Sequence, residues 1–367
     1  MEEKLLKNEE KAIFALRSLY RAYGYLPFKM SKFEEYELYV RNKDFLVSDR
    51  IITFNDTNGK LMALKPDVTL SIIKNTSDAP GVKQKVYYNE NVYRVSDSTH
   101  QYKEIMQAGL ECVGDIDSYD LFESVLLAAK SLALISEDFV LDVSHLGILT
   151  AVLDEIGANE GLRGEITACI AGKNRHDLEK LCREAGIGEE EISRLQCLID
   201  TYGEMEGVLA VLEPICQSPA AKAALEELRT LASLLKTTPY AKRIRFDFSI
   251  VNDMNYYNGI VFRGFLSGIC EGVLAGGQYD KLLRRMGRRA GAIGFALYLD
   301  LLEELNADRG EYDVDVLVLY NEKTPLAEIT LPVKEMTEQG ECVSVQKAIP
   351  EKLRYRRLLD LRKGERA

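Results

Sequence analysis

Apolar and polar positions along the first 145 residues alternate between helical and strand spacing. Residues 9–23 repeat apolar side chains at helical intervals, and the Gly24-Tyr25-Leu26-Pro27 run that follows is typical of a helix end. Short apolar runs then predict strands at residues 51–55, 61–64, 85–94, 106–114 and 139–143, and helical spacing predicts helices at residues 69–74 and 117–136. This part of the chain is expected to form a sheet with helices beside it.

The pattern changes character in the middle of the chain. Residues 146–235 are almost purely helical in pattern and rich in Ala, Leu and Glu. Strand spacing then returns, because apolar Ile244, Phe246, Phe248 and Ile250 alternate with polar side chains. The simplest account is a sheet that is interrupted by a helical insertion and then resumed.

A polar break at residues 306–310 precedes a short C-terminal pattern. The order expected there is βαβα, with a strand at 314–320, a helix at 325–337, a strand at 342–346 and a helix at 350–361. Some fifty residues bury little core by themselves, so this unit is expected to dock on its neighbour. The expected organisation is a core at residues 1–310, with its helical insertion at 146–235, and a small C-terminal α/β unit at 311–367.

Composition supports a folded protein and narrows its partners. The 367 residues are 46% apolar, which is enough for two or three ordinary domains. The net charge of −11 opposes binding to a phosphate backbone, so nucleic acid is not an expected partner. The apolar runs fall short of a membrane span of about 20 residues, and the first residues lack the apolar segment of a secretory signal. No membrane association is expected.

Cysteine and histidine usage argues against disulfides and metal. The seven cysteines are an odd number, widely spaced and without a Cys-x-x-Cys pair, and the three histidines, His100, His145 and His176, form no zinc-ligand spacing with them. The sequence therefore predicts a reduced, cytoplasmic protein with no metal and no cofactor.

One strand carries polar side chains on a single face. Gln107, Gly109 and Glu111 point the same way if residues 106–112 are extended, which places the two polar side chains about 13 Å apart with an open floor between them. Such a face can cradle a small polar ligand that carries an ammonium group. The alternative is the solvent-facing side of an antiparallel sheet.

A second candidate is the Lys65-Pro66-Asp67-Val68-Thr69 run before a predicted helix. Pro66 favours an extended Lys65, and either Asp67 or Thr69 can cap the helix that follows. The functional alternative makes Asp67 a carboxylate that binds an amine.

Aromatic residues follow the clearest strand of the second half. Tyr256 and Tyr257 lie in a polar run of residues 252–259 that is typical of a hairpin turn. They either pack against the protein or form an aromatic wall, with hydroxyl groups, for a planar ligand.

A glycine-rich region and a basic run follow. Gly276 and Gly277 permit a turn or a close approach of backbone to ligand, and the segment has neither the phosphate-loop nor the dinucleotide-binding pattern. The basic run contains Lys281, Arg284, Arg285, Arg288 and Arg289. It is either a solvated helix face or a surface for an anionic partner.

Taken in order, these segments resemble the histidine-binding catalytic domain of class II histidyl-tRNA synthetases. Residues 86–114 resemble the two strands of class II motif 2, and the remaining matches to the family lie at residues 64–69, 250–262 and 276–302. The resemblance covers about residues 5–305. It implies an α+β fold in which an antiparallel sheet is flanked by helices, with a helical insertion where the synthetases have one.

The resemblance also implies a histidine pocket. Asp67 stands where the synthetases have a Glu that binds the α-amino group, Gln107 and Glu111 match ligand-binding residues, and Tyr256 and Tyr257 match those around the imidazole. These five residues form the histidine-binding site that the resemblance implies.

The same comparison implies that the chemistry of the synthetases is lost. Asn252 replaces an arginine that stabilises charge on the reacting carboxylate and phosphate, and Leu301 replaces an arginine that binds ATP phosphates. Ile105 replaces the aromatic ring that stacks on adenine. Each lost donor at a developing charge costs about 3–4 kcal/mol, so adenylation is expected to be negligible. Of the usual ATP contacts, Arg94 is retained.

A pocket kept without its chemistry resembles the regulatory subunits of ATP phosphoribosyltransferase, which are paralogues of the synthetases. That resemblance implies a subunit that is not itself an enzyme, activates a short-form catalytic subunit in a hetero-octamer, and transmits inhibition by histidine in histidine biosynthesis. It also implies a homodimer through the synthetase-like core. The alternatives are a truncated or divergent histidyl-tRNA synthetase-like enzyme that still aminoacylates, and a sensor module for another partner.

Overall fold

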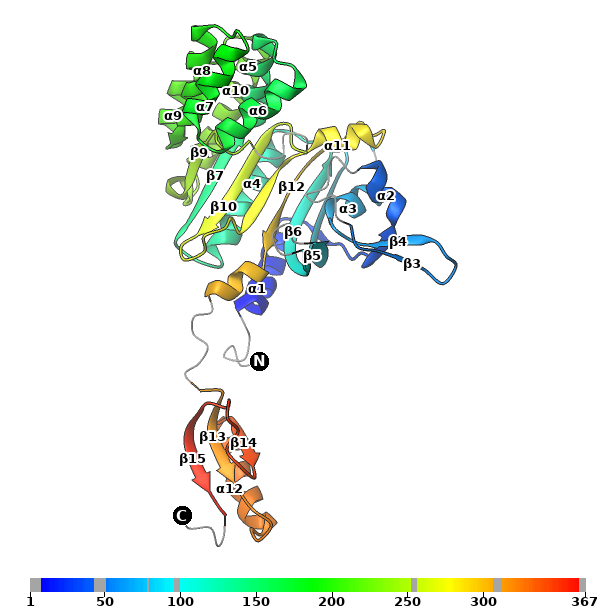
Figure 1. Ribbon diagram of the computed structural model, residues 1–367, viewed down its shortest axis with the longest axis vertical. Helices are drawn as coiled ribbons and strands as arrows, with labels where there is room; N and C mark the ends of the chain where they lie inside the picture. The colour runs from blue at the N-terminus through cyan, green and yellow to red at the C-terminus, as the bar shows by residue number, and fades with distance from the viewer. Residues whose placement is uncertain are drawn as a thin grey trace. The chain divides into compact units, whose positions relative to one another are not determined.

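The computed structural model describes residues 8–42, 51–77, 79–95, 100–251, 256–305 and 312–362. It divides the chain into two compact units, Met1–Glu304 and Leu305–Ala367, each of which is described by itself (Figure 1). Asn252 and Asn255 lie outside the described residues.

A single large sheet organises the first unit. Within the described residues it has nine strands, in the order β1 (Leu26–Pro27), β5 (Lys83–Val95), β6 (Tyr102–Gly114), β12 (Gly291–Tyr298), β11 (Leu274–Gln278), β10 (Ile260–Leu266), β7 (Phe139–His145), β9 (Ile244–Asp247) and β8 (Tyr202–Gly203). Neighbours pair antiparallel, except that β1 with β5 and β7 with β9 are parallel. The predicted antiparallel sheet is confirmed, with these two parallel pairs.

The two faces of β6 meet different helices. Glu111 accepts a hydrogen bond from Thr69 of α3 (Thr69–Lys74), whereas the next residue, Cys112, lies 3.9 Å from Asp120 of α4 (Ser118–Ala133). Asp117 starts α4 with a capping box, and α4 packs across the sheet beside α1 (Asn8–Ala22). Residues 107–114 of β6 are therefore buried on both faces, and the alternative of a solvent-facing polar side at Gln107 and Glu111 is wrong.

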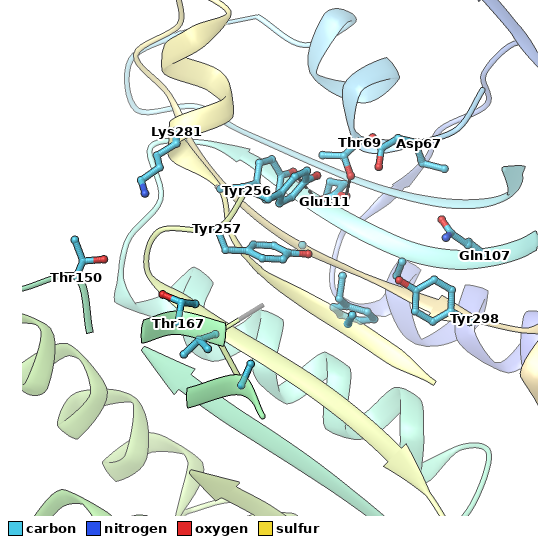
Figure 2. Close-up of a pocket in the computed structure, with 18 of the residues that line it drawn as sticks. Asp67, Thr69, Gln107, Glu111, Thr150, Thr167, Tyr256, Tyr257, Lys281 and Tyr298 are labelled. Carbon is cyan, nitrogen blue, oxygen red and sulfur yellow. Dashed lines mark hydrogen bonds between the residues drawn. The ribbon is translucent and has the colours of Figure 1, made fainter. Parts of the chain in front are cut away.

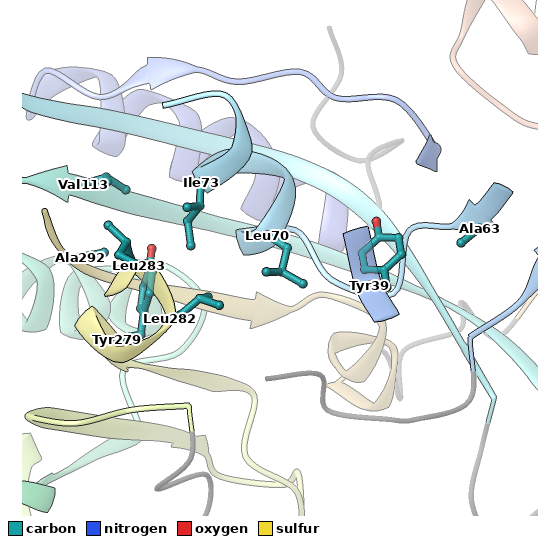
Figure 3. Packing of buried hydrophobic residues seen from close by; sticks show 9 residues of the cluster. All are labelled: Tyr39, Ala63, Leu70, Ile73, Val113, Tyr279, Leu282, Leu283 and Ala292. Atoms are coloured by element: carbon teal, nitrogen blue, oxygen red, sulfur yellow. The ribbon is translucent and has the colours of Figure 1, made fainter. Parts of the chain in front are cut away.

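A hydrophobic cluster joins the elements on the Glu111 side. It packs residues of α3 and α11 (Asp280–Arg285) against β6 and β12, together with α2 (Tyr36–Arg41) (Figure 3). Its buried members are Tyr39, Ala63, Leu70, Ile73, Val113, Tyr279, Leu282, Leu283 and Ala292. This packing fixes α3 and α11 over the sheet. Beside them lies a small antiparallel sheet in the order β2 (Phe33–Glu35), β4 (Leu61–Leu64) and β3 (Thr53–Asn55).

The segment expected to be a helical insertion is helical. It contains α5 (Leu146–Ile156), α6 (Glu160–Ala171), α7 (Arg175–Glu184), α8 (Glu189–Asp200), α9 (Met205–Leu212) and α10 (Pro219–Leu235). Helix α10 packs on both α5 and α4, which joins the insertion to the sheet. A short 3-10 turn, η3 (Ala241–Arg243), leads into β9. The strand predicted to reach Ile250 ends at Asp247.

The second unit differs from the expected βαβα order. Its elements are β13 (Val314–Leu319), α12 (Leu326–Glu338), β14 (Val343–Gln346) and β15 (Tyr355–Asp360), with β14 and β15 parallel to β13 on either side. The helix predicted at residues 350–361 is wrong. Leu359 and Leu361 are two residues apart and pack on the same apolar cluster, which is strand periodicity and not helical periodicity. The first unit ends in the 3-10 turn η4 (Asp300–Leu305).

Candidate functional site

A cavity of about 830 Å³ lies on the Glu111 side of the large sheet. Its floor comes from β6, β11 and β12, and its walls come from the start of α3, the segment at residues 256–257, and the insertion helices α5 and α6 (Figure 2). All five residues singled out from the sequence line it: Asp67, Gln107, Glu111, Tyr256 and Tyr257. Side chains that are up to 190 residues apart in the chain therefore share one space.

Strand β6 supplies the cavity with two buried polar side chains. Gln107 and Glu111 lie on the same face of the strand and are 3% and 2% exposed. Glu111 is held from both sides, because Thr69 Oγ1 donates to its Oε1 at 2.9 Å and Tyr279 Oη donates to its Oε2 at 2.5 Å. The carboxyl group is therefore fixed in place without a cation among the groups that hold it.

Burial raises the pKa of two carboxyl groups that line the cavity, those of Glu111 and Asp67. The pKa of Glu111 rises to about 8 through desolvation, which outweighs the hydrogen bonds from Tyr279 and Thr69. Desolvation also raises the pKa of Asp67, against the opposing effects of the Leu70 amide and of Arg94. A ligand cation beside these carboxyl groups would favour their charged forms, so the cavity is suited to a positively charged group.

Asp67 combines the two roles that the sequence left open. Its Oδ1 accepts a hydrogen bond from the Leu70 amide at 2.9 Å, as a residue that caps the start of α3 does, and its side chain also lines the cavity. The residues around it are anchored: Lys65 is fully buried with its Nζ 2.9 Å from Glu90, and Arg94 Nε donates to the Pro66 carbonyl at 3.0 Å.

The two tyrosines both pack and line the cavity. Their rings meet edge to face with centroids 4.7 Å apart, and Tyr256 lies 5.7 Å from Tyr279. The Asn258 side chain holds their segment by donating to Asp280 Oδ2 at 3.2 Å. Burial raises the pKa of Tyr256 well above its ordinary value, so its hydroxyl stays protonated as a hydrogen-bond donor.

The two consecutive glycines of β11 do not form the expected turn. Gly276 and Gly277 lie inside the strand, where a Cβ on Gly276 would come within 2.4 Å of the Phe295 Cβ and a Cβ on Gly277 within 2.9 Å of Tyr257. They make room for neighbouring side chains of the protein itself, and that part of the interpretation is corrected.

The basic run is not a single solvated helix face. Helix α11 ends at Arg285, and Arg288 Nη1 donates to the Ile73 carbonyl and to Thr76 Oγ1, at 2.8 and 2.6 Å. Lys281 instead lines the cavity. The residues of the basic run therefore lie in different environments and do not form one surface.

Sequence reasoning missed several residues of the site. Thr69 was considered only as a cap and Tyr279 only as part of a glycine-rich run, yet both bind Glu111. Arg163 and Thr167 of the insertion also line the cavity. No local pattern marks Arg163 and Thr167 as site residues, because only the packing of α6 across from the sheet brings them to the cavity. No metal-binding group of three or more His, Cys, Asp or Glu occurs among the described residues, and no helix in that part of the chain is long and apolar enough to cross a membrane.

A mostly antiparallel sheet with a polar ligand cavity on one face, interrupted by a helical insertion, defines a protein with the class II aminoacyl-tRNA synthetase fold. The family model described as Histidyl-tRNA synthetase matches residues 2–302. The chain belongs to the histidyl-tRNA synthetase family.

Individual relatives within this family carry a more specific name. The chain is 26% identical over 298 residues to an ATP phosphoribosyltransferase regulatory subunit of Oceanobacillus iheyensis, which covers 80% of this chain and 73% of the relative. A solved ATP phosphoribosyltransferase regulatory subunit/histidyl-tRNA synthetase from Bacillus halodurans has a TM-score of 0.77 at 22% identity and covers 97% of this chain and 94% of its own. A chain of the solved ATP phosphoribosyl transferase (HisG:HisZ) complex from Thermotoga maritima has a TM-score of 0.63 at 21% identity and covers 79% of this chain and 97% of its own.

Proposed function

We propose that this chain is a regulatory subunit of ATP phosphoribosyltransferase in histidine biosynthesis. It activates a short-form catalytic subunit and contributes to feedback inhibition by histidine. The proposal is supported by curated relatives with that name that match most of the chain. It is also supported by the likeness of the fold to a chain of a solved complex of that transferase.

Histidine is the proposed effector, and the single observation that carries this is the convergence of five residues on one cavity. Asp67 and Glu111 supply buried carboxyl groups for the positive charge of the ligand, and Gln107 supplies an amide that both donates and accepts. Tyr256 and Tyr257 form an aromatic wall for the imidazole ring.

We propose that the chain does not activate histidine with ATP. Ile105 stands at the position expected to stack on adenine, but it packs against a cluster that contains Val68 and Tyr88. Leu301 lies in η4, and its side chain has no hydrogen-bond donor for a phosphate group. Catalysis by the assembled transferase then belongs to the partner subunit.

The proposed assembly is a cytoplasmic hetero-octamer of this chain with the short-form catalytic subunit. A homodimer through the synthetase-like core forms part of it. The net charge of −11 agrees with a role that does not involve nucleic acid.

Reconstitution tests the proposal. Mixing the chain with a short-form catalytic subunit is expected to give phosphoribosyl transfer that neither protein shows alone, and histidine is expected to inhibit it. Glu111→Ala or Tyr257→Ala is expected to weaken that inhibition while activation persists. If both variants leave inhibition unchanged, the histidine site lies elsewhere; if mixing produces no activity, the regulatory role is wrong.

One observation favours a second function, a histidine-activating enzyme of the synthetase type. Arg94, the retained ATP contact, lines the cavity. Histidine-dependent exchange of pyrophosphate into ATP separates the two functions. A regulatory subunit shows no exchange, whereas exchange above that of a heat-inactivated sample would establish the enzyme.

A further inference from the structure

The cavity is larger than the proposed histidine site. About 830 Å³ is typical of pockets for drug-sized ligands, and a single amino acid fills only part of it. Gln107 and Tyr298 lie at one end in Figure 2, Tyr256 and Tyr257 in the middle, and Lys281, Thr150 and Thr167 beyond the tyrosines at the other end. The residues of this second end come from the insertion and from α11.

Helix α6 turns one face toward this end of the cavity. Its lining residues recur at helical spacing and begin with two charged residues, Glu160 and Arg163. The lining residues that follow have small side chains or none: Gly164, Thr167, Ala168 and Ala171. A Cβ on Gly164 would meet no atom within 4 Å, so space remains open beside the helix. Small side chains on this face leave room for a ligand between α6 and the core.

Two positively charged side chains from different helices line this end of the cavity. Lys281 from α11 and Arg163 from α6 both line the cavity. Burial lowers the pKa of Lys281, and the repulsion of Arg163 and Arg284 lowers it further, while Asp154 opposes the shift. Arg163 also forms an ion pair with Asp154, from Nη2 to Oδ1 at 2.5 Å. Glu160 also lines this end, so two cations, Lys281 and Arg163, face one carboxylate of the cavity lining.

We propose that the insertion side of the cavity binds the phosphate group of a small molecule between Lys281 and Arg163. An anion there offsets the repulsion between the two cations and favours the charged form of the lysine. Thr150 and Thr167 line the same end, and their hydroxyl groups are of a type that can donate to phosphate oxygens. This site is additional to the proposed histidine site and does not require that histidine binds.

Chemical labelling of the full chain tests the site directly. The rate of Lys281 acetylation by acetic anhydride is measured by mass spectrometry with inorganic phosphate, and with acetate at equal ionic strength. Phosphate is expected to slow labelling of Lys281 several-fold relative to acetate. Labelling of Lys180, an exposed residue of α7 outside the cavity, is expected to stay constant. Equal labelling of Lys281 in the two anions would overturn the proposal.

Calorimetric titration with inorganic phosphate provides the second test. Lys281→Gln and Arg163→Gln are each expected to weaken phosphate binding about tenfold or more, because a hydrogen bond between charged groups is lost. Arg229→Gln is the matched control: Arg229 lies on α10, pairs with Glu213 and Glu226, and does not line the cavity. If the control weakens binding as much as the other two variants do, phosphate binds by overall charge and the proposed site is wrong. The test uses the chain without a catalytic partner, so its failure leaves the proposed regulatory function standing.

Discussion

Glu111 shows how one residue connects the fold to ligand binding. Its carboxyl group is buried between Thr69 and Tyr279, and both hold it by donating hydrogen bonds from hydroxyl groups. A protonated carboxyl group brings no charge into this buried site, whereas an ionised one is costly without a cation. Burial of Glu111 therefore favours a positively charged ligand in the cavity.

Glu111→Gln is expected to weaken histidine binding by roughly 10- to 100-fold, because a charge-assisted hydrogen bond is worth about 1.5–3 kcal/mol. The amide is close in shape to the protonated acid, so the fold is expected to persist. Calorimetric titration with histidine measures the effect. The matched control is Glu104→Gln, on the same strand but bonded to Asn91 and Tyr93 outside the cavity. A change no larger than that of the control would remove Glu111 from the site.

The pKa of Glu111 also predicts how stability depends on pH. The folded protein keeps this proton up to a pKa of about 8, whereas the unfolded chain loses it near the ordinary value of 4.5. Between these values unfolding releases a proton, so the free energy of unfolding falls as pH rises, by at most about 1.4 kcal/mol per pH unit from this group.

Urea unfolding at several pH values between about 5 and 8 measures this slope. Glu111→Gln is expected to have a flatter pH dependence than the unmodified chain over this range. A saturating concentration of histidine is expected to flatten it as well, because a bound cation favours the ionised carboxylate. Parallel curves for the chain and the variant would contradict the raised pKa.

At the scale of elements, the packing of β12 against β6 leaves no space for a side chain at position 294, next to Glu111. A Cβ on Gly294 would overlap the Glu111 carboxylate and would also come too close to the Leu110 carbonyl oxygen. The missing side chain of β12 is thus what allows a carboxyl group to lie on the floor of the cavity. The requirement comes from the pairing of Gly294 with Glu111 in adjacent strands.

Gly294→Ala is expected to displace Glu111, to destabilise the fold by about 1–3 kcal/mol through overpacking, and to abolish histidine binding. Gly207→Ala is the control, since it lies on α9 with no atom within 4 Å of its Cβ and is expected to raise stability by about 0.5–1 kcal/mol. Urea unfolding and calorimetric titration give the two readouts. Histidine binding by Gly294→Ala at the affinity of the unmodified chain would contradict the role of this close contact.

At the scale of the whole molecule, the proposed feedback requires a coupling between the proposed histidine pocket of this chain and the active site of the catalytic partner. Linkage is reciprocal, so if the less active state of the complex binds histidine more tightly, histidine favours that state by the same factor. Couplings of this type are typically about 1–3 kcal/mol, or 5- to 150-fold in affinity.

Histidine is therefore expected to bind the assembled complex with an affinity that changes several-fold when substrates of the catalytic subunit are added. Calorimetric titration of the complex with and without those substrates measures the shift. The Glu111→Gln variant serves as the control, because it is expected to show weak binding in both conditions. Equal affinity with and without substrates, together with effective inhibition, would place the inhibitory site on the partner.

Much of the fold was determined by the sequence alone. The helix at residues 69–74 and the strand at 61–64 were predicted at their observed bounds, and the helical pattern of residues 146–235 was observed as α5 to α10. These patterns are local, since spacing along the chain decides which face an isolated element buries. The helix predicted at residues 350–361 was wrong for the converse reason. Pairing with β13, which is distant in the chain, makes residues 355–360 a strand.

The candidate site was likewise predicted from the sequence only in part. The sequence by itself singled out five of the residues that line the cavity, because strand alternation places Gln107 and Glu111 on one face and the resemblance to the family motifs marks Asp67, Tyr256 and Tyr257. Only the tertiary structure decided that Glu111 is buried against Tyr279 and that the insertion faces the same cavity. These contacts join residues that are distant in the chain, and burial, which sets the pKa of Glu111, exists only once those segments have packed together.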